Sequence, residues 1–298
     1  MSGAFAPALG LLARFWVACI NASYRWSVAG RARVAALLGD ALWWIAWPRR
    51  SIARSNLRIC FPQLSDRDRN AIGRRCFRNI ARAALDHSVL WRGTREEIQR
   101  FVRIVGGEHL FNPANRPLIL VAPHFVGLDA GGIRISTEMK GVSIYARQSN
   151  EVWDRWLKRG RERFNEPVLI TRQGSDLRAA LRAMRRGMPF YYLPDMDHGP
   201  ANSIFVPFFG EPAATLPMVS RIARLIDARV VMAVTEMTAD GYVLHIEPPW
   251  ADFPGASIEA DTARMNREIE RWVTRLPDQY LWPHRRFKTR LEGERPFY

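Results

Sequence analysis

The pattern of apolar and polar positions changes twice along the 298-residue chain. Two apolar runs, 4–20 and 34–48, come first, and the second ends in a tryptophan-rich stretch. In 49–103, apolar residues recur three and four positions apart, which predicts helices, and Ser65 has the character of a helix N-cap. Beyond residue 104, short continuous apolar runs alternate with amphipathic segments, which indicates strands alternating with helices.

This alternation predicts the fold class. Continuous apolar runs bounded by Pro or Gly are typical of strands that are buried on both faces. The expected strands are 117–123, 142–146, 167–171, 189–193, 229–234 and 241–246, and the expected helices are 153–164, 175–186, 216–228 and 257–276. We predict an α/β fold with a mostly parallel central sheet flanked by helices, in which the last two strands are candidates for a hairpin.

The N-terminal segment differs from the rest of the chain. Tryptophan and arginine bordering apolar helices are typical of a segment that lies in the lipid headgroup layer. We therefore expect residues 1–48 to form a helical membrane-associating segment and 49–298 to form one globular domain, because no linker interrupts the latter. Two ordinary core helices, or one spanning helix in which Arg14 snorkels, fit the same pattern.

The chain is strongly basic, with 44 Lys+Arg against 29 Asp+Glu and a net charge of +15. A hydrophobic content of 48% excludes a disordered basic tail. The charge leaves three partner classes open: nucleic acid, an anionic membrane face, and a phosphorylated or acidic substrate. Residues 1–62 contain eight arginines and one acid, so nearly half of the charge lies in and beside the membrane candidate, and nucleic acid becomes the least favoured partner.

The first candidate for chemistry follows the expected strand 117–123. His124 comes directly after this strand, at the end where α/β sheets place their ligands, and Asp129 follows five residues later. A carboxylate beside a histidine fixes its tautomer and stabilises the imidazolium, which makes the histidine a general base. The spacing alone favours a strand-end histidine bonded to the backbone. The position after a buried strand, and the small neighbouring glycines that let other groups approach, make the two interpretations about equally well supported.

Two further groups of polar residues are candidates for substrate binding. Asp195, Asp197 and His198 follow the expected strand 189–193. Arginines that can bind phosphate or carboxylate are Arg147, Arg161, Arg163 and Arg172. The His and Asp side chains are of types that can bind metal, but no metal-ligand spacing, nucleotide-binding motif or cysteine cluster is present, and we expect neither metal nor cofactor.

Together these motifs resemble a known family. His124-x4-Asp129 is similar to the first signature of the glycerolipid acyltransferase superfamily. The stretch Asp195–Pro200 with Phe205–Phe209 and Ala213–Thr215, the C-terminal run Gln279–Arg290, and Asn56–Pro62 resemble the late (secondary) acyltransferases of lipid A biosynthesis. Gly160-Arg161-Glu162-Arg163 matches the family's Gly-Arg-x-Arg segment, and Asp129 stands where many members carry Glu.

The resemblance implies an acyltransferase domain over 49–298. It implies transfer of a fatty acyl chain from an acyl carrier protein thioester to a hydroxyl of a phosphorylated glycolipid, at the cytoplasmic face of the bacterial inner membrane. His124, oriented by Asp129, would deprotonate the acceptor hydroxyl. Two rivals stay open: an acyltransferase that uses a lysophospholipid or glycerol phosphate, and, in a different class, a basic nucleic-acid-binding protein.

Overall fold

A computed structural model describes residues 6–171 and 177–298 of the chain. Its centre is a seven-stranded sheet in the order β1-β9-β8-β2-β5-β3-β4, in which every neighbouring pair is parallel except β8 and β9. The sheet strands are β1 Val102–Val105, β2 Leu118–Val121, β3 Val142–Tyr145, β4 Val168–Thr171, β5 Phe190–Tyr192, β8 Arg229–Met237 and β9 Tyr242–Ile246. The predicted fold class and the β8–β9 hairpin are thus confirmed.

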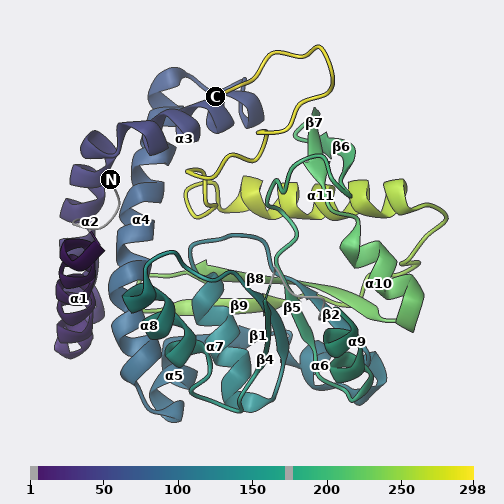
Figure 1. Ribbon diagram of the computed structural model, residues 1–298, viewed down its shortest axis with the longest axis horizontal. Helices are drawn as coiled ribbons and strands as arrows, with labels where there is room; N and C mark the ends of the chain where they lie inside the picture. Colours follow the sequence, from purple (N-terminus) through teal and green to yellow (C-terminus); the bar gives the residue numbers. More distant parts are fainter. Residues whose placement is uncertain (1–5, 172–176) are drawn as a thin grey trace.

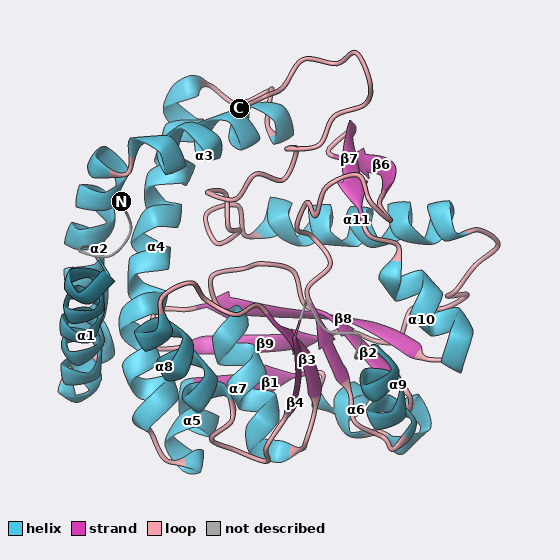
Figure 2. Cartoon of the chain, in the orientation of Figure 1, coloured by secondary structure: helices cyan, strands magenta, loops and turns pink. Residues whose placement is uncertain are grey.

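Helices cover both faces of this sheet (Figures 1 and 2). The helices are α1 Ala6–Ala22, α2 Val28–Ile45, α3 Trp47–Cys60, α4 Asp66–Arg92, α5 Arg95–Phe101, α6 Gly107–Phe111, α7 Leu128–Glu138, α8 Glu151–Arg161, α9 Leu177–Arg185, α10 Met218–Ile226 and α11 Ile258–Arg275. One core cluster joins α9, α10 and α11 to one face, and a second joins α5 and α7 to the other. Strand β2 is buried along its whole length because it lies between these two layers.

The N-terminal helices α1 and α2 lie along the long helix α4, as Figure 1 shows. Helix α4 begins at Ser65, whose hydroxyl accepts a hydrogen bond from the Asp68 amide at 3.1 Å, as the sequence predicts. Gly39 lets α2 approach α4 closely, because a Cβ at this position would lie 2.4 Å from the Cα of Arg78. Among the described residues, no helix is long and apolar enough to cross a membrane.

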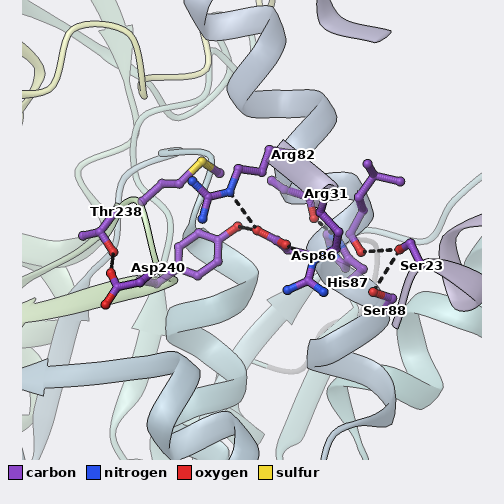
Figure 3. Close-up of polar contacts among 12 residues, drawn as sticks. Ser23, Arg31, Arg82, Asp86, His87, Ser88, Thr238 and Asp240 are labelled. Atoms are coloured by element: carbon purple, nitrogen blue, oxygen red, sulfur yellow. Dashed lines mark hydrogen bonds and ion pairs between the residues drawn. The ribbon is translucent and has the colours of Figure 1, made fainter. Parts of the chain in front are cut away.

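A buried ion pair anchors these helices to the core (Figure 3). Asp86 on α4 is fully buried and accepts a hydrogen bond from Nε of Arg31 on α2 at 2.7 Å. The hydroxyl of Tyr242 on β9 donates to the same carboxylate at 2.9 Å, and Arg82 lies 3.4 Å from it. A buried charge without such partners would be costly, so Asp86 fixes α4 against both α2 and the sheet. The next residue on α4 is His87.

Two elements differ from the sequence-based prediction. Strand β1 lies in a stretch expected to be helical; it is an edge strand with an exposed Arg103, so it lacks the continuous apolar run of a central strand. Strands β6 (Ile204–Phe208) and β7 (Glu211–Thr215) form a separate hairpin over α11, in a stretch where no strand was expected. Phe208 is fully buried in the aromatic core against Tyr280, so it packs the interior.

Candidate active site

The loops after β2 and β5 meet because these strands are parallel neighbours. His124 follows β2 and Asp195 follows β5, and the imidazole Nδ1 of His124 lies 2.7 Å from Oδ1 of Asp195. The backbone amide of His124 also donates to this carboxylate, at 3.0 Å to Oδ2. Asp195 is fully buried, whereas the His124 side chain is 15% exposed. This arrangement holds the histidine ring by a carboxylate at the carboxyl edge of the sheet.

Asp195 is ionised despite its burial. Burial by itself would raise the pKa of the carboxyl, but the neighbouring His124 ring and amide hold the pKa well below its ordinary value. An ionised carboxylate accepts hydrogen bonds only, so Nδ1 of His124 is the protonated nitrogen of the neutral ring. Nε2 is then the basic nitrogen, which is the tautomer that a general base requires.

Asp129, expected beside His124, has different partners. It lies in the first turn of α7, and its Oδ1 accepts from Arg161 of α8 at 2.8 Å, while Oδ2 lies 3.2 Å from Nε2 of His87. The pairing of His124 with Asp129 is therefore corrected, because the start of α7 directs this carboxylate towards α4 and α8. Burial would raise the pKa of Asp129, but Arg161 and His87 outweigh it and lower the pKa.

Both ring nitrogens of His87 face groups that accept hydrogen bonds. Its Nδ1 lies 2.7 Å from the carbonyl oxygen of Ala83, which can only accept, so Nδ1 must donate. Nε2 faces the carboxylate of Asp129, which is also an acceptor, at 3.2 Å. Trp91 and Trp156 flank the ring, with centroids 4.8 and 5.6 Å away. Asp129 thus lies between the His87 ring and the Arg161 guanidinium.

An apolar cavity lies between α7 and the sheet, next to this ion cluster. Its charged lining residues are Asp129 and Arg161. The remaining lining residues are apolar or uncharged and come mainly from α7 and strands β2 to β5: Leu120, Leu128, Gly132, Ile133, Ile135, Ser136, Met139, Gly141, Val142, Ser143, Ile144, Pro167, Leu169, Pro189, Tyr191 and Leu193. The cavity therefore offers an apolar interior with one charged wall, built on the strands whose ends carry His124 and Asp195.

Comparisons with known proteins decide the family. The family described as "Bacterial lipid A biosynthesis acyltransferase" matches residues 11–289. The chain belongs to this family. A "Lipid A biosynthesis lauroyltransferase" of Escherichia coli (strain K12) is 31% identical over 94% of each chain. A "Lipid A biosynthesis palmitoleoyltransferase" of the same organism is 32% identical over 96% of this chain and 95% of the relative. A "Lipid A biosynthesis myristoyltransferase" of that organism is 31% identical over 96% and 88%.

The C-terminal run that resembles the lipid A acyltransferases lies against the histidine. The Leu281 amide donates to the carbonyl oxygen of His124 at 2.9 Å, and the ring of His284 lies 6.2 Å from the ring of His124. Nδ1 of His284 lies 2.7 Å from the Leu281 carbonyl oxygen, so Nδ1 donates. Nε2 of His284 is buried without a hydrogen-bond partner among the described residues. Burial lowers the pKa of His284 to about 4, so this ring is neutral.

The sequence analysis assigned Asp195 to substrate binding and did not single out His87 or His284 individually, both of which lie in the candidate site. Asp195 was expected to bind substrate, but it holds His124. Helix periodicity gives no sign of His87, because its partner Asp129 lies 42 residues away on another helix. His284 belongs to a run that the sequence analysis singled out only for its resemblance.

The other predicted binding residues lie outside the His124–Asp195 contact. Arg163 donates to the carbonyl oxygens of Leu90 and Gly93 at 2.8 and 2.6 Å, which ties the end of α8 to the end of α4. Asp197 accepts from the amide of Thr289 at 2.6 Å. Arg147 is exposed after β3, His198 is partly buried, and Arg172 lies outside the described residues.

Proposed function

We propose that the protein transfers a fatty acyl chain from an acyl carrier protein thioester to a hydroxyl of a lipid A precursor. The observation that carries this proposal is the contact between His124 Nδ1 and Asp195 at the ends of β2 and β5, two strands whose residues Leu120 and Tyr191 also line the apolar cavity. The family membership and the names of the three relatives support lipid A as the acceptor class.

The reaction follows from the tautomer of His124. Nε2 removes the proton of the acceptor hydroxyl while the ionised Asp195 stabilises the resulting imidazolium. The alkoxide attacks the thioester carbonyl and forms a tetrahedral oxyanion. When this collapses, the new ester C–O bond is kept, the C–S bond breaks, and the thiolate takes the proton from His124. No residue of the protein becomes acylated.

The cavity and its charged wall are assigned to the substrates. The apolar lining between α7 and the sheet accepts the acyl chain, because it removes alkyl surface from water. Asp129 acts by holding Arg161 at the charged wall, where the guanidinium is available to a phosphate or an oxyanion. Asp129 is therefore proposed as a positioning residue of the site.

The N-terminal helices are assigned to the membrane face. Large apolar side chains of α1 and of the end of α2 are exposed, among them Phe15, Trp16, Trp44 and Ile45. Such a patch is typical of an interfacial segment, so we place residues 1–48 on the cytoplasmic face of the bacterial inner membrane. Binding to phosphatidylcholine vesicles should weaken for Trp44→Ser with Ile45→Ser, and unchanged binding would contradict this placement.

One assay tests the activity. Purified protein is incubated with a tetra-acyl lipid A precursor and a panel of acyl carrier protein thioesters, and the product masses are read. We expect one added acyl chain, and no product from His124→Ala. His109→Ala, a substitution on the separate helix α6, should keep full activity. Acylation of a lysophospholipid in place of the lipid A precursor would overturn the acceptor assignment, and full activity of His124→Ala would overturn the site.

A further inference from the structure

A second feature lies away from the active site, where helices α2, α3 and α4 enclose a basic hollow. Ten residues line it, and six of them are arginines. They are Arg50, Arg54, Arg67, Arg74, Arg75 and Arg78, together with Trp43 and Trp44 at the end of α2 and Asn70 and Ala71 on α4. We call this the arginine hollow. In Figure 1 the ends of α2 and α4 that form it lie near α3, far from α9.

The arginine hollow holds more positive charge than its neighbouring carboxylates neutralise. Asp40 accepts two hydrogen bonds each from Arg74 and Arg78, all at 2.7 Å. Asp278 lies 3.1 Å from Arg75. Exposed Arg54 and Arg67 form no hydrogen bond or ion pair with any residue in the described ranges, so their guanidinium donors are directed to solvent or to a ligand. Arg54 is near enough to Asp66 to contribute to lowering the pKa of that carboxyl, which Arg69 lowers most.

Tryptophans fix one wall of the arginine hollow. The Arg50 guanidinium lies over the rings of Trp43 and Trp44, 5.9 and 5.2 Å from their centroids. Trp43 is buried because its ring lies over Gly73 of α4, where a Cβ would lie 2.7 Å from it. This close packing sets the spacing of the arginines on α3 and α4 in the absence of a ligand, so little order is lost on binding.

Exposed apolar side chains beside the arginine hollow indicate which kind of phosphate it binds. Trp44, which lines the arginine hollow, is 66% exposed, and the adjacent Ile45 and Trp47 are 75% and 65% exposed. An apolar helix end with exposed tryptophans is suited to the interface of a bilayer, where lipid phosphates lie at the same depth. Guanidinium groups bind phosphate oxygens through paired hydrogen bonds.

From the unpaired guanidinium groups beside this apolar helix end, we propose that the arginine hollow binds the phosphate headgroup of an anionic membrane phospholipid. The inference rests on the proposed membrane placement of residues 1–48, but it requires no substrate of the acyl transfer reaction. Binding there would hold the enzyme to anionic regions of the leaflet through a site separate from His124.

The test is a vesicle sedimentation assay with the full chain. Arg54→Gln with Arg67→Gln is compared with Arg178→Gln with Arg182→Gln, a matched pair on α9 that is likewise exposed. Vesicles are either phosphatidylcholine alone or an equal mixture with phosphatidylglycerol. We expect affinity for the mixed vesicles to fall roughly 30-fold for the first pair, equivalent to about 2 kcal/mol, and little for the α9 pair. Binding to phosphatidylcholine alone should be unchanged.

Three outcomes would overturn the proposal. Equal losses for the two pairs would show that only overall charge matters. Unchanged affinity of the Arg54/Arg67 pair for mixed vesicles would exclude the arginine hollow as a lipid site. Loss of acyl carrier protein binding with vesicle binding retained would assign the hollow to a protein partner. Neither the vesicle assay nor the acyl carrier protein binding assay contains a lipid A precursor, so an inactive enzyme would not alter their results. Acyl transfer measured in detergent would test the proposed function separately.

Discussion

The imidazole Nδ1 of His124 lies 2.7 Å from Oδ1 of Asp195, although 71 residues separate them in the chain. This contact predicts that Asp195 determines which nitrogen of His124 is basic. Asp195→Asn replaces an obligate acceptor with an amide that can donate to Nδ1, which moves the ring proton to Nε2. We expect kcat to fall about 10³- to 10⁴-fold, measured by initial rates of acyl transfer.

Two carboxylate variants make this test specific. Asp240→Asn, at an exposed turn where the carboxylate accepts from Thr238, should leave kcat unchanged. Asp129→Asn should raise KM for the acceptor more than it lowers kcat, because Asp129 positions Arg161 and does not contact His124 through its described hydrogen bonds. A large loss of kcat in Asp129→Asn with near-normal Asp195→Asn would restore Asp129 as the partner of His124.

The doubly protonated His87 is a second prediction. Its two ring nitrogens face the Ala83 carbonyl and the Asp129 carboxylate, so nitrogen chemical shifts at pH 7 should show protons on both. His87→Gln removes the ring that contacts Asp129 and should lower kcat/KM for the acceptor about tenfold, since the carboxylate that positions Arg161 then loses one of its two partners. A shift typical of an unprotonated ring nitrogen in the wild-type protein would contradict the assignment.

The central strands were predictable because burial on both faces leaves a continuous apolar run. Strand β2 shows this most clearly, since all four of its residues are buried. Strand β1 was not predictable, because at the sheet edge the exposed Arg103 interrupts its apolar pattern. The β6–β7 hairpin contains Pro207 and Pro212, residues that argue against strands, and its packing on α11 provides the stabilisation that local sequence does not.

The location of the candidate site was predictable from strand ends, but the contacts between its residues were not. His124 and Asp195 were both identified because each follows an apolar run. Their contact depends on β2 and β5 being neighbours, and strand order cannot be read from one sequence. The five-residue spacing to Asp129 favoured a local pair, whereas the observed partners of Asp129 come from α4 and α8. Tertiary packing therefore decided which carboxylate contacts His124.

The cavity predicts a graded effect of side-chain size at Gly132. This residue lines the cavity from α7, and a Cβ there would lie 3.6 Å from the ring of Tyr191, an ordinary contact. Gly132→Ala should therefore keep the fold and change acyl preference little. Gly132→Leu extends into the cavity and should shift preference to shorter acyl chains, by roughly 10- to 200-fold in kcat/KM for the longest chain, as measured with the thioester panel. Equal use of all chains by Gly132→Leu would place the acyl chain elsewhere.

His284 predicts how stability depends on pH. Its folded-state pKa of about 4 lies below the ordinary value of 6.5, so between these pH values the unfolded chain binds the proton that the folded protein excludes. The contribution of His284 to stability is therefore full above pH 6.5 and is lost as the pH falls towards 4, by up to about 3 kcal/mol. His284→Gln does not titrate, and its amide can donate to the Leu281 carbonyl, so urea unfolding should show a smaller loss between pH 7 and pH 4.5. His109→Gln should keep the wild-type dependence, and groups common to all three proteins cancel in the comparison. An identical loss in His284→Gln would show that this ring is already protonated in the folded protein.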